Sequence, residues 1–257
     1  MLGQNVKAVA KNTEKLSSGY AVNRAADDAA GLSISEKMRN QIRGLNQSVK
    51  NAEDGISLIQ TAEGNMNEIH SILQRMGELA IKSRNDVNAS EDRRSINDEI
   101  VQLKAEISSI TKKAEFNGTK LLNGEMSGGK NLQVGANMGE LLAISIKGTS
   151  LSLLGLTSTT VSTALGASAA IGEIQSAIKN VSAQRSLLGA VQNRLEYTIN
   201  NLENYSENLT SAESQIRDTD MATEMVSFSK NQILQQAAQS MLAQANQATQ
   251  GVLNLLQ

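Results

Sequence analysis

Two short patterns contain residue types that can do chemistry. The segment Gly124–Asn131 (GEMSGGKN) nearly matches the G-x-x-x-x-G-K-[ST] loop that binds phosphate. It fails at the last position, because Asn131 has no hydroxyl to hold magnesium, and a strand-like alternation follows it instead of a helix N-terminus. We therefore interpret this segment as a flexible turn.

The adjacent carboxylates Asp27 and Asp28 are the second candidate, since paired carboxylates can act as general acid and base. Neighbouring residues on a helix point apart, however, and the local sequence NRAADDAAG favours capping of a helix start and pairing with Arg24. The lone His70 has Glu68 nearby but no recognisable nucleophile motif, which indicates a surface or seam-edge side chain. We expect no enzyme activity, no catalytic residue and no cofactor.

Composition excludes further classes of function. The chain has no cysteine, no proline, no tryptophan and one histidine, so thiolate sites are impossible and most catalytic zinc or iron sites lack their ligands. A net charge of −2 with three tyrosines and two phenylalanines provides neither a basic patch nor a stacking platform for nucleic acid. No apolar run is long enough to predict membrane insertion, and no cleaved signal peptide is visible.

The elements that must position these residues are mostly helices. Heptad steps of three and four residues run without a break from Leu188 to Ile216 and nearly so from Ala52 to Ala80. Shorter patterns cover Ser95–Lys113, after a turn at 88–92 that offers an N-cap and acidic first-turn residues, and Leu234–Leu255. A weak N-terminal pattern passes through Leu2, Val6, Val9, Thr13 and Leu16. Both chain ends are thus candidate amphipathic helices.

The periodicity changes between Phe116 and Gly166. Apolar residues then alternate with a period of two, which predicts a β-hairpin over about 131–146 with its turn around Gly135–Gly139. Residues 157–170 are rich in Ser, Thr, Ala and Gly, a composition typical of a linker that leads into a helix at about Ile171. Methionines at helical spacing are interpreted as core residues. They are Met38, Met66, Met76, Met221, Met225 and Met241.

Together these elements predict a mainly α fold, a long antiparallel helical bundle or coiled-coil rod with a small β-hairpin region. The terminal stripes consist mostly of Ala, Leu, Val and Gln and bury little per residue. We therefore expect the terminal helices to be mobile in the isolated chain and to fold against other chains.

Longer strings resemble bacterial flagellin. They are EKLSSGYAVNRAADDAAGLSISEKMRNQIRGL (14–45), NAEDGISLIQTAEGNMNEIHSILQRMGELA (51–80), FNGTKLLNG (116–124), LGAVQNRLEYTINNL (188–202) and ILQQAAQSMLAQANQATQGVLNLLQ (233–257). The resemblance implies a structural subunit of the flagellar filament, a homo-polymer that serves motility. It also implies an extracellular protein, exported by the flagellar secretion apparatus without a cleaved signal peptide. A hook-filament junction protein is the alternative within the same family.

The resemblance also implies how the chain is divided. Residues 1–18 and 218–257 would form an inner coiled-coil layer, 19–30 a connecting spoke and 31–217 a rod core. The core would contain helices at about 32–85, 92–114 and 171–217. A short variable stretch, 149–170, stands where many members carry large outer domains, and a stretch that typical members have ahead of Met1 is missing. The chain thus resembles a minimal flagellin that lacks the extreme N-terminal stretch.

Several partners follow from the resemblance. Gln74, Arg75, Leu79 and Glu99 match the region of flagellins that is bound by the innate-immune receptor Toll-like receptor 5. From the residues alone, Arg75 and Glu99 are ordinary solvated charges off the seam, and Leu79 is expected to be partly exposed. The family also implies a flagellar secretion chaperone and hook-associated and cap proteins. Chaperone and assembly contacts are expected at Ile233, Leu234, Met241, Leu242, Val252, Leu255 and Leu256.

Two other classes of function make different predictions. An enzyme built on a flagellin frame needs an inserted catalytic domain, for which residues 149–170 are too short, and a metal site needs a second histidine. A dedicated receptor-binding module would use the same face as the rod. A filament protein pellets as ordered fibres, a junction protein stays monomeric, and a binding module forms a saturating one-to-one complex.

Overall fold

The computed structural model describes residues 2–255, with side chains described as far as residue 248. It contains two compact units: unit 1 consists of Met1–Arg43 and Tyr205–Gln257, and unit 2 is Gly44–Asn204. The long helices α2 (Ala29–Arg84) and α4 (Ala164–Arg217) contribute residues to both units. Each unit is described separately below.

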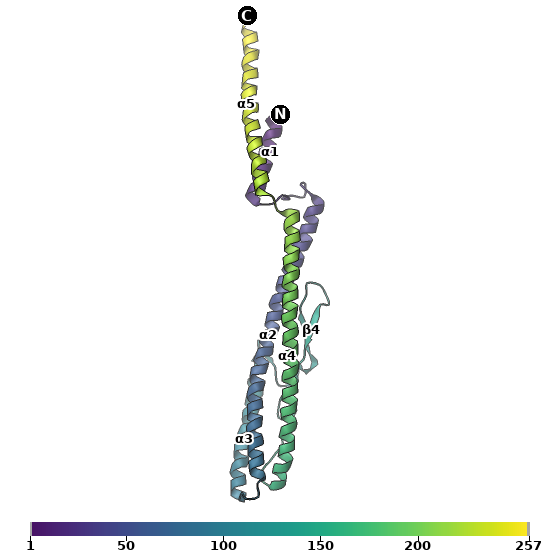
Figure 1. Cartoon of the computed structure of the whole chain (residues 1–257), viewed down its shortest axis with the longest axis vertical. Coiled ribbons are helices and arrows are strands. Elements are labelled where there is room, and N and C mark those ends of the chain that lie inside the picture. The colour runs from purple at the N-terminus through teal and green to yellow at the C-terminus, as the bar shows by residue number, and fades with distance from the viewer. Residues whose placement is uncertain (1, 256–257) are drawn as a thin grey trace. The chain divides into compact units, whose positions relative to one another are not determined.

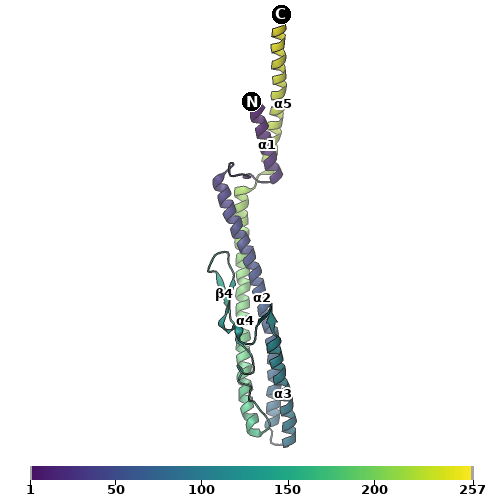
Figure 2. The ribbon, with the colours of Figure 1, turned by 180° about the vertical axis from the view of Figure 1, so that it is seen from behind.

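Unit 2 is built on three helices, α2, α3 (Ser90–Lys113) and α4, which lie side by side (Figures 1 and 2). Side-chain pairs fix their directions. Arg185 of α4 lies 3.5 Å from Glu63 of α2, whereas a Cβ on Gly77 of α2 would meet Ile174 of α4, so the two helices are antiparallel. The predicted helical bundle with a small β region is confirmed.

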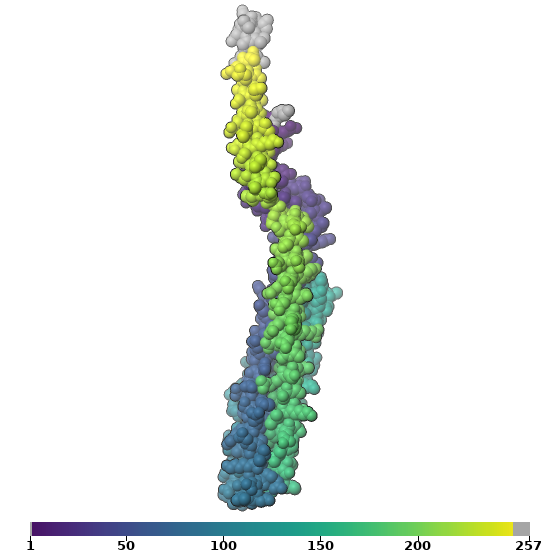
Figure 3. Space-filling model, viewed as in Figure 1, coloured from purple at the N-terminus to yellow at the C-terminus, as the bar shows by residue number. Residues whose placement is uncertain are grey.

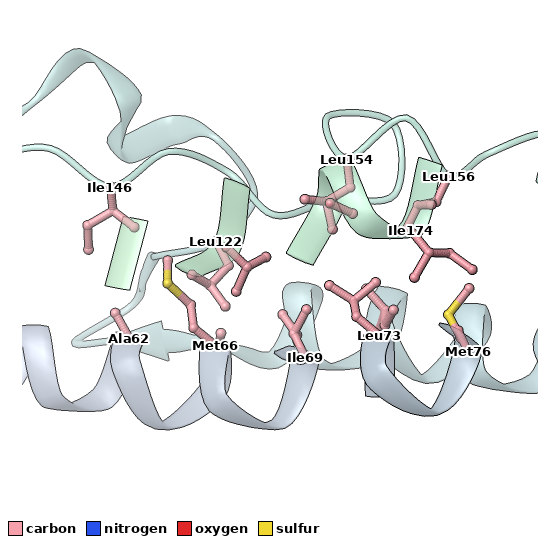
Figure 4. Close-up of a cluster of buried hydrophobic side chains, with 14 of the residues drawn as sticks. Ala62, Met66, Ile69, Leu73, Met76, Leu122, Ile146, Leu154, Leu156 and Ile174 are labelled. Atoms are coloured by element: carbon pink, nitrogen blue, oxygen red, sulfur yellow. The ribbon is translucent and has the colours of Figure 1, made fainter. Parts of the chain in front are cut away.

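The core of unit 2 lies on the heptad face of α2. Figure 4 shows these α2 side chains facing the loops after α3 and the start of α4. The fully buried residues of α2 there are Ala62, Met66, Ile69, Leu73 and Met76. Their partners include Leu122, Ile146, Leu154, Leu156 and Ile174. On α4, Leu188, Leu195 and Leu202 are buried, as the heptad pattern predicted.

Two antiparallel β-pairs follow α3. The predicted hairpin is confirmed as β3 (Lys130–Gln133) and β4 (Leu141–Ile144), with Leu132 opposite Leu142. The sequence analysis missed a smaller pair, β1 (Glu115–Phe116) and β2 (Thr119–Lys120). Its signal was present: Asn117-Gly118 is a two-residue turn sequence, and both residues have positive φ, 47° and 75°. The phosphate-loop look-alike forms a short 3-10 turn, η1 (Glu125–Gly128), directly before β3.

Two helix starts differ from the prediction. Helix α4 begins at Ala164 rather than near Ile171. The Ser- and Thr-rich composition was misleading because Thr163 caps the helix, with its Oγ1 accepting a hydrogen bond from Gly166 N at 3.1 Å, and Ala167 and Ala170 are buried. Helix α3 has Ala89 at its N-cap, so the expected side-chain cap is absent there, although Asp92 accepts a hydrogen bond from Ala89 N.

The methionine prediction is correct only in part. Met66 and Met76 are fully buried in unit 2, and Met38 is half-buried. Met221, Met225 and Met241 are exposed on α5 (Met221–Leu255) of unit 1, so their interpretation as core residues is wrong for the described chain. Helical spacing alone does not say whether a stripe is covered by its own chain.

Candidate assembly and recognition surfaces

In unit 1 the first and last helices pair. Helix α1 (Leu2–Ser18) lies against the first part of α5, and α5 extends beyond it (Figure 1). The expected seam of α1 is wrong at two positions, because Val6 and Thr13 are exposed. The structure instead buries Asn12, whose Nδ2 has no hydrogen-bond partner. Helix α1 therefore buries an amide, whereas a coiled coil normally buries apolar side chains.

The paired face of α5 is also largely polar. Its half-buried positions are Glu224, Ser227, Phe228, Asn231, Gln235 and Ala238. The apolar residues expected for assembly are nevertheless exposed: Ile233 is 66% exposed and Met241 72%, while Leu234 and Leu242 are exposed as well. The side chains of Val252 and Leu255, and the whole of Leu256, lie outside the described residues. Helix α5 thus leaves apolar residues uncovered on more than one side, and we use the name α5 stripe for the set Ile233, Leu234, Met241 and Leu242.

A polar cluster ties the segment after α1 to the end of α4 within unit 1. Ala21 N donates to Arg217 O at 2.7 Å, and Thr219 N donates to Gly19 O at 3.0 Å. The Arg217 guanidinium lies over the Tyr20 ring, 4.6 Å from its centroid, and pairs with Glu36 at 3.0 Å. A hydrogen bond from Arg217 is the main reason that the pKa of Glu36 lies below its ordinary value.

The paired aspartates have separate structural roles. Asp28 Oδ1 accepts a hydrogen bond from Gly31 N at 2.9 Å, so the predicted capping at the start of α2 is confirmed. The predicted ion pair between these aspartates and Arg24 is wrong. Asp27 pairs instead with Lys11 at 2.8 Å, and Arg24 pairs with Glu14 at 2.8 Å. The hydrogen bond from Lys11 is the largest cause that holds the pKa of Asp27 below its usual value.

In unit 2 the residues expected at a receptor surface lie on α2 and α3. Arg75 Nη2 lies 2.9 Å from Glu99 Oε1, and Arg75 also pairs with Glu78 at 3.2 Å. Gln74 is exposed, and its Nε2 lies 3.2 Å from Nε2 of the half-buried His70. We call the exposed group Gln74, Arg75 and Glu99 the α2–α3 face. The structure joins Arg75 to Glu99, whereas the hydrogen bond of Gln74 is to His70.

Leu79 does not join that face. It is only 2% exposed and belongs to the core of unit 2, so the expectation that it is partly exposed is wrong. The seam is broader than the heptad steps indicated, because α3 packs on one side of α2 and α4 on the other (Figure 2). Leu79 and Ala80 are therefore both covered.

Over residues 2–248, whose side chains the structure describes, no three His, Cys, Asp or Glu side chains are grouped so that they would bind a metal ion. The helices in that range are also too polar or too short for any to cross a membrane. The most distinctive features are therefore surfaces on helices.

These features define an α-helical bundle protein whose first and last helices pair with one another. The chain belongs to the bacterial flagellin family. Residues 1–127 match the bacterial flagellin N-terminal helical region, and residues 171–256 match the bacterial flagellin C-terminal helical region.

Similar proteins extend along nearly the whole chain. The flagellin of Halalkalibacterium halodurans is 53% identical over 257 residues, covering 99% of this chain and 94% of that protein. The flagellin of Bacillus subtilis is 49% identical, covering 99% and 95%, and the flagellar filament 33 kDa core protein of Treponema phagedenis is 47% identical, covering 99% and 94%. The crystal structure of Bacillus cereus flagellin is 30% identical with a TM-score of 0.55, and covers 60% of this chain and 88% of that one.

Proposed function

We propose that this protein is the structural subunit of a flagellar filament, a homo-polymer that serves bacterial motility. The observation that carries the proposal is the α5 stripe. Its residues are exposed on the isolated chain although the helix is paired, and exposed apolar stripes of this kind are covered by a partner. A repeated heterologous contact between identical chains does not close and generates an open filament.

The same proposal assigns parts of the chain to layers of the filament. Residues 1–18 and 218–257 would form the inner coiled-coil layer, 19–30 the spoke and 31–217 the rod core. The support is the pairing of α1 with α5 and the family relationship. Extracellular localisation and export by the flagellar secretion apparatus belong to this proposal, together with chaperone binding at residues 233–257 and contacts with hook-associated and cap proteins.

Seeded polymerisation tests the filament proposal. Purified protein is added to short filament seeds, pelleted and imaged, with circular dichroism before and after assembly. The variant Ile233→Ser/Met241→Ser removes half of the α5 stripe, and the matched control Gln232→Ser/Gln239→Ser changes exposed polar positions of the same helix. We expect the wild type and the control to form ordered filaments and the stripe variant to need a much higher protein concentration. Soluble wild-type monomer at all concentrations would overturn the proposal and favour a junction protein.

We also propose that the α2–α3 face is recognised by Toll-like receptor 5. The support is the match of its residues to the receptor-bound region of flagellins and their exposure beside one another. Leu79 is buried, so it would contribute indirectly, by packing in the core and fixing the position of α2. Reporter cells that express the receptor would test this with the wild type, Arg75→Ala and the control Arg84→Ala, an exposed arginine of the same helix. Equal signalling by all three would contradict the proposal.

A further inference from the structure

The chain contains two Asn-Gly sequences, and both lie in the segment of unit 2 that follows α3. They are Asn117-Gly118, in the turn between β1 and β2, and Asn123-Gly124, directly before η1. Part of this segment, coloured teal, is visible at the surface of unit 2 beside α4 in Figure 3. Both asparagines are exposed to solvent. The same dipeptide thus occurs twice, so a difference in chemistry between the two copies would come mainly from the surrounding structure.

An asparagine that is followed by glycine can react with its own backbone. The glycine nitrogen attacks the asparagine Cγ, its proton passes through solvent to the leaving amide nitrogen, and the Cγ–Nδ2 bond breaks with release of ammonia. Water then opens the resulting succinimide ring on either side and leaves aspartate or isoaspartate, with no change of oxidation state. Glycine favours the attack because it has no Cβ to crowd the nitrogen. The rate depends on how often the nitrogen and Cγ reach a reactive geometry.

Asn123 is restrained against this reaction. Its Nδ2 donates to Glu125 Oε1 at 2.7 Å and its Oδ1 accepts from Glu125 N at 3.0 Å, so both ends of the amide are bonded. The attacking atom is crowded as well, since a Cβ on Gly148 would lie 2.7 Å from Gly124 N. The preceding residue, Leu122, is fully buried, and its O accepts a hydrogen bond from Thr149 N at 2.9 Å. Reaction at Asn123 therefore requires a packed contact to open.

Asn117 lacks these restraints. No hydrogen bond from the described part of the chain reaches its side-chain amide, and a Cβ on Gly118 would meet no atom within 4 Å. Asn117 and Gly118 both have positive φ, as in a type I′ turn, and in that conformation the Gly118 nitrogen points away from Cγ. The turn must therefore open before the ring can close. The strands beside it pair over only two residues each, and so short a hairpin opens at low cost.

We propose that Asn117 is a site of spontaneous isoaspartate formation in the folded protein, with water as the only co-reactant, and that Asn123 is protected from the same reaction. The free amide and the open surroundings of Gly118 carry the first half of the proposal. The bonded amide and the crowded Gly124 nitrogen carry the second half. The modification is a property of the single chain and does not depend on filament assembly.

The modification would alter the β1–β2 pair. In isoaspartate the main chain runs through the side-chain carbons, so the turn gains a backbone atom and a negative charge. A turn lengthened in this way no longer fits the register that places Phe116 opposite Thr119. Phe116 is half-buried and packs against the core of unit 2. The modified chain should therefore be less stable in unit 2 than the unmodified chain.

Ageing of the wild-type protein at mildly alkaline pH tests the proposal. Trypsin cleaves after Lys113, Lys120 and Lys130, so the two sites lie on separate peptides for mass spectrometry, and an isoaspartyl methyltransferase labels the isoaspartate. In the folded protein we expect Asn117 to deamidate at least about tenfold faster than Asn123, because its hairpin opens more often. In urea both sites should react at similar rates. Equal rates in the folded protein, or a difference that persists in urea, would overturn the proposal.

Two variants test the effect on stability. Asn117→Gln has a longer side chain that closes the ring much more slowly, and Asn123→Gln is the matched control. Each aged sample is compared with a fresh sample of the same variant, so an effect of the substitution itself on folding cancels. We expect ageing to lower the urea midpoint of the wild type and of Asn123→Gln but to leave that of Asn117→Gln unchanged. An equal loss in all three proteins would show that the damage lies elsewhere than at Asn117.

Discussion

Arg75 on α2 and Glu99 on α3 are joined by two hydrogen bonds that converge on one carboxylate oxygen, from Nε at 3.1 Å and from Nη2 at 2.9 Å. Glu78 accepts a third bond from Nη1 at 3.2 Å. These carboxylates, Glu99 first, raise the pKa of Arg75 above its ordinary value. An exposed ion pair contributes little to stability, so its main effect here is to orient the guanidinium.

That orientation predicts a difference between two substitutions. Arg75→Lys keeps the charge but loses the planar fork that bonds Glu99 twice. If the α2–α3 face is recognised as proposed, the lysine variant should bind the receptor almost as poorly as Arg75→Ala, at least about tenfold weaker than the wild type. Surface-bound receptor titrated with each protein gives the affinities. Wild-type affinity for Arg75→Lys would mean that the receptor recognises only the positive charge at this position.

Gly77→Ala should stabilise unit 2. The glycine lies inside α2, and a Cβ there would meet only Ile174 Cγ2, at an ordinary contact distance of 3.7 Å. Replacing glycine by alanine within a helix typically stabilises by about 0.5–1 kcal/mol, so we expect the urea midpoint to rise.

Gly148→Ala is the matched control for that substitution. Its Cβ would collide with the backbone of Gly124, so this variant should be destabilised by about 1–3 kcal/mol. A lowered midpoint for Gly77→Ala, or an unchanged one for Gly148→Ala, would contradict the packing described for unit 2.

Asn12→Leu should strengthen the pairing of α1 with α5. The wild-type amide is buried with Nδ2 unbonded, and an unsatisfied buried donor costs about 1–3 kcal/mol. Hydrogen exchange of the α1 amides should slow in the variant. Thr13→Leu, at the neighbouring exposed position, is the control and should leave exchange unchanged. Faster exchange in Asn12→Leu would show that the amide has a stabilising role in this pair.

Lowering the pH should reduce the stability of unit 1. The carboxylates Glu36 and Asp27 have folded-state pKa values below their ordinary ones, chiefly through hydrogen bonds from Arg217 and Lys11. Their contribution to stability is present above the unfolded pKa, near 4, and is lost as pH falls through the lower folded value. Urea unfolding followed by tyrosine fluorescence at about pH 7, 5 and 3 should show the loss. Glu36→Gln should weaken the pH dependence, and an unchanged profile would argue against the Glu36–Arg217 contact.

The helices of unit 2 were predictable because their apolar residues are covered by the same chain. Leu188 and Leu195 follow the heptad steps and are buried. The predicted start of α4 was wrong because the composition of the segment before it suggested a linker, although the segment contains a helix cap. The Ser- and Thr-rich stretch before Ile171 contains the cap Thr163 and buried alanines, so α4 begins earlier than expected.

The surfaces were less predictable, because a sequence pattern does not say which chain covers a residue. Leu79 was expected to be partly exposed and is buried, whereas Met241 was expected in the core and is exposed. The ion-pair partner of Asp27 could not be predicted from neighbouring residues in the sequence, because Lys11 lies on a separate helix, α1. The hairpin at Asn117-Gly118 was within reach, because its turn sequence is diagnostic.

The buried amide of α1 and the polar paired face of α5 bear on how fast filaments would start. A helix pair held through polar side chains separates at low cost, and a subunit can exchange that contact for a better one. If neighbouring subunits cover the α5 stripe as proposed, the end of an existing polymer offers several neighbours at once, whereas a free subunit offers one. New polymers would therefore begin rarely and grow readily once begun. Assembly of the pure protein would show a lag phase that added seeds abolish.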